Sequence, residues 1–321
     1  MEAVPKPAIF TTFVPMNLIE ITSLEMPGPD RFVHRTETQL RSGVGGGSFI
    51  AESPNVILRA LEAGLEPLAM LCEKGFADAA LRGGDNALRS DDSPAGEIFR
   101  RAGDIPIYVG SPELLSRITG YSLLRGISCE FRRPAPRTAA EVCGLTGNAS
   151  AVPNAHPGAV PSATPAEPTR PSARRIAVIQ GVVDAANIGA IFRSAAALGI
   201  DAILLAPDCC DPLNRRTVRT SMGTVFQIPW AILDGTDTVA ALHRLGFKTA
   251  AMALRDGALA PDSPELQAVE RLAIILGNEG DGLPQPVIDA SDYVVCIPMS
   301  HGVDSLNVAI AGAIAFYVLR K

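Results

Sequence analysis

The sequence lacks any apolar run that is long enough to cross a membrane. The longest, at 308–319, falls short of the about 20 residues that a helical span requires. Residues 1–21 also lack the basic start, the long apolar centre and the small-residue cleavage site of a signal peptide. We therefore expect a cytoplasmic protein that has no membrane partner.

The cysteines lack the spacing of a metal site or of a redox motif. No two of them are arranged as CxxC, and the adjacent Cys209 and Cys210 could pair only through a strained bridge. We therefore expect reduced, buried thiols and no bound metal. The six residues concerned are Cys72, Cys129, Cys143, Cys209, Cys210 and Cys296.

The chain has little charge, and the balance is slightly acidic. Charged residues make up 19% of its 321 residues, hydrophobic residues make up 47%, and the formal net charge is -6. This composition is typical of a globular protein that is long enough for two domains, each with its own core. The acidic balance counts mildly against nucleic acid as a partner, although phosphate binding depends on where Lys and Arg gather.

The first third of the chain alternates strand and helix signals. An apolar segment at 49–51 precedes a helical pattern that starts at Ser53 or Pro54 and stops at Gly64. A further apolar strand and then a strand, a turn and a helix capped near Ser111 follow. This alternation predicts a small three-layer domain over residues 1–133.

Residues 134–173 differ in composition from both flanks. Pro, Ala, Ser and Thr dominate, and the one hydrophobic patch, at 142–145, is short. Such a segment buries too little apolar surface to fix its own structure. We interpret it as a flexible linker between the first domain and a second one at 174–321.

The second domain has the pattern of a parallel sheet that is covered on both faces. Apolar runs rich in Val, Ile, Leu and Ala alternate with helical segments. The runs are 176–183, 202–206, 225–232, 247–254, 272–276 and 293–297, and the helices are 187–198, 236–245 and 305–319. In such sheets ligands bind at the carboxyl ends of the strands.

Three segments follow strands of this domain and carry polar or glycine residues. The first, 181–199, does not have the GxGxxG spacing of a dinucleotide fingerprint, which disfavours a nicotinamide-dependent enzyme. The second, 274–283, is a strand that runs into a glycine-rich turn. In the third, 297–319, a polar loop precedes a helix that we expect to begin at Ser305 as its N-cap.

Taken together, the three segments resemble the motifs of the SpoU/TrmH family of S-adenosylmethionine-dependent RNA ribose 2′-O-methyltransferases, a branch of the SPOUT superfamily. Asn187 and Arg193 match the first motif, and the Gly-Asn-Glu-Gly of 277–280 matches the second. The third motif is matched by the Ile-Pro-Met of 297–299 and the Ser-Leu-Asn of 305–307. The first domain is similar to the family's N-terminal RNA-binding domain.

The resemblance implies a fold, a cofactor and partners. The expected fold is α/β: a C-terminal parallel-sheet SPOUT domain with a trefoil knot, and a smaller N-terminal αβα domain that binds RNA. S-adenosylmethionine is the implied cofactor, ribosomal RNA is favoured over tRNA as the substrate, and a homodimer through the knotted domain is expected.

The resemblance also implies roles for individual residues. It assigns the reaction to Asn187, Arg193, Glu279, Ser305 and Asn307, and cofactor binding to Leu276, Gly277, Ile297, Met299 and Leu306. Arg215, Arg216 and Arg219 are expected to form a basic edge for RNA.

Two alternatives remain open from the residues themselves. Each polar site residue has a structural interpretation, such as a helix cap or a turn residue. A non-catalytic RNA-binding or ribosome-assembly protein with the same fold would also fit.

His301, where many relatives have Gly, is interpreted as a loop residue that contacts solvent, phosphate or backbone and not as a general base.

Overall fold

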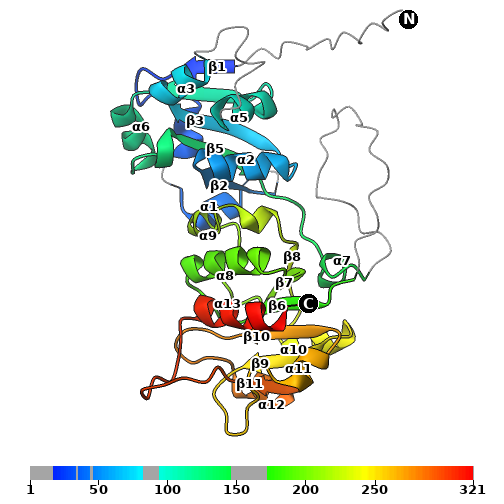
Figure 1. Ribbon diagram of the computed structural model, residues 1–321. Helices are drawn as coiled ribbons and strands as arrows, with labels where there is room; N and C mark the ends of the chain where they lie inside the picture. The colour runs from blue at the N-terminus through cyan, green and yellow to red at the C-terminus, as the bar shows by residue number, and fades with distance from the viewer. Residues whose placement is uncertain (1–16, 34, 44–45, 82–93, 146–171, 321) are drawn as a thin grey trace, which may run out of the picture.

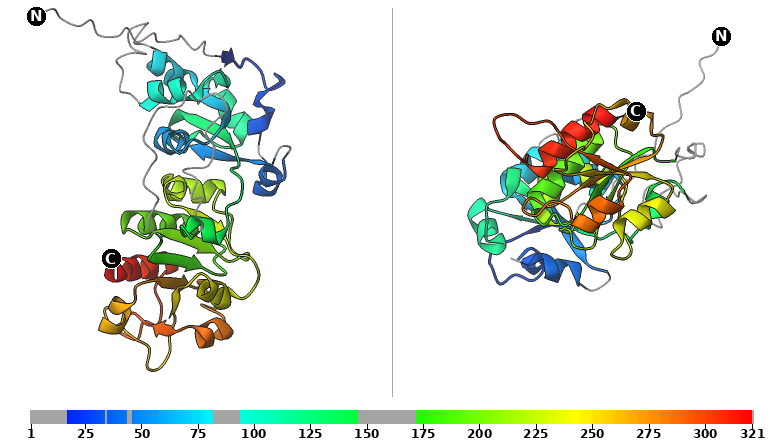
Figure 2. Two further views of the ribbon diagram at one scale, coloured as in Figure 1. Left: turned by 90° about the vertical axis from the view of Figure 1, so that its right-hand side faces the viewer. Right: turned by 90° about the horizontal axis from the view of Figure 1, so that it is seen from below.

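The structure is a computed structural model that describes residues 17–33, 35–43, 46–81, 94–145 and 172–320. Two sheets, one in each half of the chain, lie end to end, and the short helix α9 (Arg215–Thr220) lies between them (Figure 1). The C-terminus lies in the half that holds the second sheet (Figure 2). No helix in the described part of the chain is long and apolar enough to span a membrane.

The first sheet is mixed, with the strand order β1-β4-β3-β5-β2. Strands β1, β4 and β3 are parallel, and β5 pairs antiparallel with both β3 and β2. The strands are β1 (Asn17–Glu20), β2 (Ser48–Glu52), β3 (Pro67–Glu73), β4 (Pro106–Gly110) and β5 (Ile127–Arg132).

Helices cover both faces of this sheet because its strands are apolar on both sides. Phe49 packs with the cluster of α2 (Pro54–Glu62), α3 (Lys74–Leu81) and α5 (Pro94–Ala102). Its neighbour Ile50 faces the opposite way, toward α1 (Glu37–Arg41) and α6 (Pro112–Thr119). The short 3-10 helices η1 (Pro29–Phe32) and η2 (Leu124–Gly126) complete this half. The three-layer prediction is confirmed.

The second sheet is parallel throughout, with the order β11-β9-β10-β6-β7-β8. Its strands are β6 (Arg175–Ile179), β7 (Ala202–Leu205), β8 (Trp230–Ile232), β9 (Lys248–Met252), β10 (Leu272–Leu276) and β11 (Tyr293–Val295). After β6 the chain adds β7 and β8 on one side of β6. The later strands β9, β10 and β11 lie on the other side of β6. The strand order therefore switches between β6 and β10, which is where α/β sheets bind ligands.

Two groups of helices sandwich this sheet. Ile179 and Leu276 pack with α8 (Ala185–Ala197) and α13 (Val308–Leu319), whereas Val178 and Ile275 pack with α7 (Ala139–Val142), α10 (Thr238–Arg244) and α12 (Gln285–Ala290). Helices α8 and α13 lie side by side on one face (Figure 1). The α/β class with a parallel second sheet is thus confirmed, and the trefoil knot stays a prediction.

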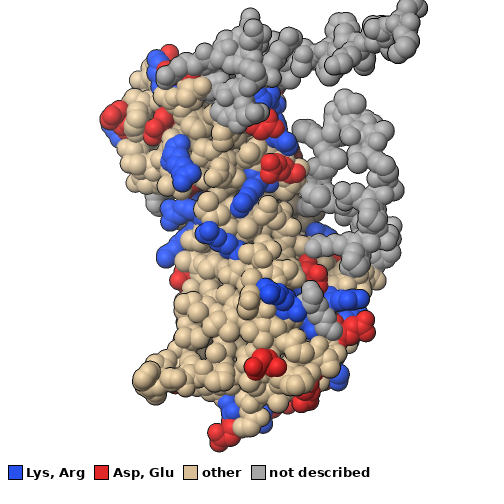
Figure 3. Space-filling model, viewed as in Figure 1, with Lys and Arg blue, Asp and Glu red and all other residues tan. Residues whose placement is uncertain are grey.

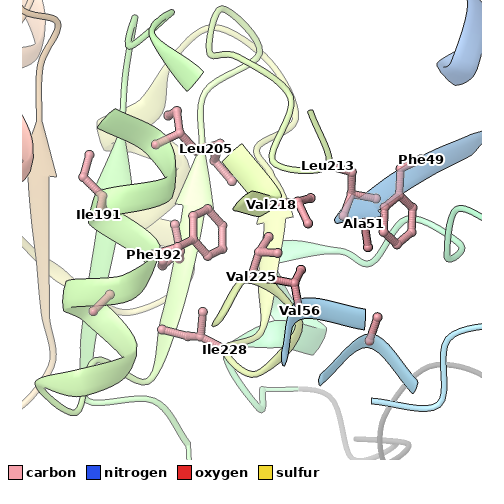
Figure 4. Close-up of a cluster of buried hydrophobic side chains, with 14 of the residues drawn as sticks. Phe49, Ala51, Val56, Ile191, Phe192, Leu205, Leu213, Val218, Val225 and Ile228 are labelled. Atoms are coloured by element: carbon pink, nitrogen blue, oxygen red, sulfur yellow. The ribbon is translucent and has the colours of Figure 1, made fainter. Parts of the chain in front are cut away.

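Some expected elements differ from the structure. The run at 225–232 was expected to be one strand, but residues 224–226 form the 3-10 helix η3 (Thr224–Phe226), and only β8 at its end is extended. Val225 and Ile228 are apolar because they fill the space between the two halves, not because they belong to a strand (Figure 4). The five- and six-residue helices α9, α11 (Pro264–Ala268) and α12 are too short to show a helical period.

The expected linker is partly ordered. Within 134–173, residues 139–142 form α7, and Val142 and Cys143 are buried against the second sheet. Thr138 caps this helix by accepting a hydrogen bond from the backbone N–H of Glu141. The linker prediction therefore does not hold for residues 134–145, and most of the remainder, 146–171, lies outside the described residues.

The halves are joined through a continuous apolar cluster. Phe49 and Val56 of the first half pack with Val218 and Val225 of the second, and the cluster continues to Phe192 of α8 (Figure 4). All five side chains are at most 2% exposed, so the joint is as well packed as the interior of either half.

Candidate functional site

Three polar side chains from distant segments meet at the switch point of the second sheet. The Nδ2 of Asn307 donates a hydrogen bond to the Oδ1 of Asn187 at 3.0 Å, and the Nδ2 of Asn187 donates to the Oε1 of Glu279. Asn187 belongs to the helix that follows β6, Glu279 follows β10, and Asn307 precedes the last helix. The structure thus brings together one residue from each of the three sequence motifs.

Asn187 is placed by the start of α8. The N-cap is Asp184, whose Oδ1 accepts from the backbone N–H of Ala186 at 2.9 Å, so Asn187 is not needed as a cap. The helix lies close to α9 at Gly189, where a Cβ atom would stand 2.0 Å from the Oγ1 of Thr220. Glycine at this position therefore sets how closely α8 packs against α9, and with it where Asn187 lies.

Glu279 stands on a tight glycine-rich turn. A Cβ atom on Gly277 would lie 2.4 Å from the carbonyl carbon of Gly282, so only glycine fits where the turn closes on itself. The Oδ1 of Asn278 accepts from the backbone N–H groups of Gly280 and Asp281, at 2.9 and 2.7 Å. The turn is thereby fixed and leaves the Glu279 carboxylate exposed at its tip.

Asn307 is both a helix cap and a site residue. Its Oδ1 accepts from the backbone N–H groups of Ala309 and Ile310, at 3.0 and 3.4 Å. Because an amide has one oxygen and one nitrogen, the Nδ2 must face Asn187, whose own Nδ2 is then left for Glu279. In this series of hydrogen bonds each residue donates to the next, from Asn307 to Asn187 to Glu279, and the last acceptor is a carboxylate.

The expected N-cap at Ser305 is therefore wrong. The last helix begins at Val308, and the Ser305 hydroxyl instead donates to the Oδ1 of Asp304 at 3.2 Å. Asn caps a helix as well as Ser does, and the N-cap is Asn307, whose side chain can also reach Asn187. Ser305 is exposed and does not join the hydrogen-bonded chain.

The loop before α13 offers backbone groups instead of side chains. The backbone N–H groups of Ile297, Met299 and Leu306 donate to no acceptor among the described residues. His301 in the same loop is exposed and has φ 60°, a left-handed conformation that glycine adopts freely and histidine tolerates. The loop can therefore bind a ligand through its main chain.

Arg193 stands apart from the hydrogen-bonded chain. It is exposed on α8, and its guanidinium has no hydrogen-bond or ion-pair partner among the described residues. It follows Asn187 by six positions, so the two side chains leave the helix about 120° apart around its axis. The structure therefore presents Arg193 to solvent as an unpaired cation.

The three arginines expected to bind RNA are in different situations. Arg215 is half-buried, and its Nη1 donates to the hydroxyl of Tyr121 in the first half at 2.7 Å. The Nη1 of Arg219 lies 4.0 Å from the Oε2 of Glu52, and half of the Arg219 side chain is exposed. Arg216 is exposed and its guanidinium has no partner among the described residues.

The six cysteines are free, but the expected burial holds only for Cys72, Cys129 and Cys143, because Cys209, Cys210 and Cys296 are partly exposed. Cys209 lies at the end of β6, where its Sγ donates to the carbonyl of Ile179 at 3.2 Å. Burial raises the pKa of this thiol to about 11, so it is protonated at neutral pH and is a poor nucleophile. Among the described residues, no group of three His, Cys, Asp or Glu side chains is placed to hold a metal ion.

Sequence reasoning missed one residue that shapes the site, Asp184, and matched another, Asn278, to the second motif without giving it a role. Asp184 caps α8, and Asn278 holds the turn that presents Glu279. An Asp just before a helical pattern is a recognised start signal, so the cap could have been found. The role of Asn278 depends on the turn geometry and gave no separate signal.

These features define an α/β protein that has a hydrogen-bonded group of polar side chains, a candidate ligand site, at the switch point of a parallel sheet. The family model of the SpoU rRNA Methylase family matches residues 174–317. A protein of Mycobacterium bovis named as an uncharacterized tRNA/rRNA methyltransferase is 35% identical over 277 residues, which cover 85% of this chain and 81% of that protein. The chain belongs to the SpoU/TrmH family of RNA methyltransferases.

Two further comparisons concern a characterised relative and the fold. The 23S rRNA (guanosine(2553)-2'-O)-methyltransferase RlmP of Bacillus subtilis is 35% identical over 149 residues, which cover 46% of this chain and 59% of RlmP. The crystal structure of an AdoMet-bound rRNA methyltransferase from Sinorhizobium meliloti is similar in fold, with a TM-score of 0.68. That match covers 95% of this chain and 98% of the other at 22% identity.

Proposed function

We propose that this protein transfers a methyl group from S-adenosylmethionine to a ribose 2′-hydroxyl of ribosomal RNA. The observation that carries the proposal is the hydrogen-bonded chain Asn307–Asn187–Glu279, which unites all three motif segments at the switch point. The relative RlmP, whose name states 2′-O-methylation of 23S rRNA, supports both the atom and the RNA class. A ribosomal RNA substrate places the proposed activity in the cytoplasm.

The residues present suit the cofactor. Gly277 leaves no side chain at the end of β10, and the N–H groups of Ile297, Met299 and Leu306 have no acceptor within the described part of the chain. Adenine nitrogens and a carboxylate are acceptors that such main-chain donors bind. We assign cofactor binding to these residues together with Leu276, whose carbonyl already accepts from the N–H of Gln180.

When bound, S-adenosylmethionine supplies an electrophilic methyl group on a sulfonium centre. The protein has to align the ribose hydroxyl and help to remove its proton. The Glu279 carboxylate has a second oxygen outside the hydrogen-bonded chain, and we assign it to orient the hydroxyl, with Asn187 and Asn307 fixing its rotamer. Ser305, which is exposed in the adjoining loop, is assigned to the ribose side of the site.

Arg193 is assigned to the target phosphate. A guanidinium stays protonated in ordinary sites, which makes it a poor base but a strong phosphate ligand. Holding the phosphate beside the reacting hydroxyl gives the released proton an acceptor, either the phosphate or a transiently perturbed arginine. Among the residues that the structure describes, no side chain or backbone group pairs with this guanidinium, which leaves it available for this role.

A homodimer is part of the proposal. Helices α8 and α13 form a shallow apolar groove of about 430 Å³ whose lining includes Ala190, Ile310 and Tyr317. Ile310 is 53% exposed and Tyr317 is 56% exposed, although α13 is apolar around its whole circumference. A helix of this kind is stable in water when both sides are covered, and we assign the outer side to a second copy of the chain.

We further propose that residues 1–133 bind RNA and that 174–321 form the methyltransferase domain. The direct test incubates the purified protein with tritiated S-adenosylmethionine and either ribosomal RNA or tRNA. A 2′-O-methyl group blocks alkaline cleavage of the next phosphodiester, so the label should appear in alkali-resistant dinucleotides from ribosomal RNA. If calorimetry detects no S-adenosylmethionine binding and no label is transferred, the non-catalytic RNA-binding alternative holds.

A further inference from the structure

A buried polar cluster fixes the joint between the two halves. Glu52, at the end of β2, is only 3% exposed. Its Oε1 lies 3.9 Å from the Nη1 of Arg215. The same guanidinium bonds to the Tyr121 hydroxyl and lies over the Tyr121 ring, and the Arg215 N–H donates to Glu37 at 3.3 Å. Burial raises the pKa of Tyr121, although the nearby Arg215 opposes the shift. Arg215 is therefore a residue of the joint.

Further contacts hold the joint in one geometry. The Nη1 of Arg59 in α2 donates to the carbonyl of Met222 at 2.5 Å. The guanidinium of Arg133 binds both carboxylate oxygens of Asp211, at 2.8 and 2.7 Å, with the two side chains only 14% and 18% exposed. Both bonds come from the Nη2 of Arg133, and a charge-assisted pair that is largely shielded from solvent restrains the distance between the two segments. Together with the apolar cluster of Figure 4, they make the two halves one unit.

Four other arginines surround this cluster from both halves. Arg41 lies one helical turn beyond Glu37 on α1, and Arg125 lies four residues beyond Tyr121 in η2, with φ 55° and ψ 30°. Arg216 and Arg219 lie on α9 itself. All four are exposed, and Arg41, Arg125 and Arg216 have no side-chain partner among the described residues.

These four side chains make the joint cationic. Lys and Arg side chains gather on one face over the level of α9, between the two halves (Figure 3). The formal charge of the whole chain is -6, so this concentration runs against the average. The acidic groups of the cluster offset it only in part, because two carboxylates, Glu37 and Glu52, stand against these four arginines and Arg215. Exposed guanidinium groups on a rigid surface, three of them without a side-chain partner among the described residues, are suited to phosphate.

We propose that the joint itself is an RNA-backbone site, in which Arg41 and Arg125 of the first half and Arg216 and Arg219 of the second bind phosphates of one RNA strand. The inference deepens the proposed function, on which the identity of the ligand as RNA rests. Arg215 is left out of the site because it is used to hold the halves together. Arg219 stays available because its 4.0 Å approach to Glu52 is longer than a hydrogen bond.

The rigid joint has a consequence for substrate choice. Since α9 packs on α8, which carries Asn187 and Arg193, the phosphates bound at the joint lie at a fixed distance from the reacting ribose. A target must therefore present a backbone segment beside its reactive nucleotide in one geometry. The first half would then act as part of one continuous binding surface, and not as a tethered capture module.

The test measures binding of a fluorescently labelled RNA hairpin of mixed sequence by four single variants, Arg41→Ala, Arg125→Ala, Arg216→Ala and Arg219→Ala. Phosphate contacts do not depend on base sequence, so the hairpin need not be the natural target. Each variant should bind roughly three- to tenfold more weakly, and the slope of log affinity against log salt should fall by about one. The control is Arg244→Ala, an exposed arginine on α10 that has no partner among the described residues and lies on the other face of the sheet.

The proposal is overturned if Arg41→Ala and Arg125→Ala bind with the affinity and salt slope of the wild type. Losses confined to the α9 variants would place the RNA site on the second half alone. Tritium transfer measured in parallel separates this result from failure of the proposed function. A wild type that methylates RNA while the two first-half variants bind normally refutes only the joint site, whereas a wild type that binds but never methylates refutes only the function.

Discussion

The Nδ2 of Asn307 lies 3.0 Å from the Oδ1 of Asn187, although the two residues are 120 positions apart in the chain. The contact ties the first turn of the last helix to the first turn of α8, and the Oδ1 of the same Asn307 caps its own helix. The Asn307 side chain therefore both caps α13 and takes part in the candidate site. Changes at Asn307 should affect both the reaction and the start of α13, whereas changes at Asn187 should affect mainly the reaction.

Asn187→Ala should lower methyl transfer strongly. The substitution removes the acceptor for Asn307 and the donor to Glu279, which frees the carboxylate from its fixed rotamer. We expect roughly a hundredfold lower turnover with little change in melting temperature. Tritium transfer to ribosomal RNA measures the effect, and Gln285→Ala, an exposed change away from the site, is the control. Full activity in Asn187→Ala would exclude the hydrogen-bonded chain from catalysis.

Arg193→Ala should lower methyl transfer by roughly a thousandfold while S-adenosylmethionine binding stays intact. The guanidinium has no hydrogen-bond or ion-pair partner among the described residues, and we assign it to the RNA phosphate and not to the cofactor. Arg193→Lys should recover only part of the rate, since an ammonium cannot grip phosphate with two parallel donors. Calorimetry with the cofactor and tritium transfer together separate the two effects. Near-normal turnover in Arg193→Ala would refute the assignment.

Ile310→Glu should convert the protein to a monomer. Ile310 is 53% exposed beside the apolar groove of α8 and α13, and a carboxylate buried between two copies would have no partner there. Light scattering after size exclusion reports the mass. Leu254→Glu is the matched control, because Leu254 is 59% exposed but does not line the groove. If both variants have the mass of the wild type, the dimer face lies elsewhere.

Asp292→Asn should destabilise the second half in a pH-dependent manner. Burial alone would raise the pKa of Asp292, but hydrogen bonds from Lys248, Thr249 and His243 outweigh it and hold the pKa well below its usual range. A carboxylate whose pKa is lowered by folding stabilises the protein above its unfolded pKa of about 4, and this contribution is lost as the pH falls toward the folded value. The wild type should be more stable than the variant by about 1 to 3 kcal/mol at neutral pH.

Urea unfolding at a series of pH values tests this prediction. The difference between wild type and Asp292→Asn should shrink steadily below about pH 4. Asp289→Asn serves as the control, because Asp289 is 52% exposed in a surface pair with Arg255 and should show little difference at any pH. A constant difference across the range would mean that the charge of Asp292 does not contribute.

Ser53→Gly should stabilise the first half. Ser53 has φ 75° and ψ 147°, a conformation that is costly for a residue with a Cβ and open to glycine. We expect a gain of about 1 kcal/mol, measured by urea unfolding, after the extra entropy of glycine in the unfolded chain is taken into account. Ser53→Ala keeps the Cβ and should show no gain. Equal stability of the two variants would mean that the surrounding structure relieves the strain.

The sequence by itself determined the regular parts of this fold. The apolar run 272–276 predicts a buried strand, and Ser111 marks a helix start through its own side chain, although the run 225–232 is a strand only at its end. These signals are local, because the period of a strand or helix and the chemistry of a cap are properties of neighbouring residues. The sequence also identified Asn187, Glu279 and Asn307, because the segments that contain them resemble the motifs of the SpoU/TrmH family.

Only the tertiary structure decided which polar residues meet. Ser305 and Asn307 are both good caps, and the choice of Asn307 depends on its reach to Asn187 across the switch point. The sequence does not distinguish Arg215 from Arg216 and Arg219. In the structure, however, Arg215 donates a hydrogen bond to Tyr121 of the other half of the chain. Burial and long-range partners are set by how the sheets and helices pack, and no local pattern carries that information.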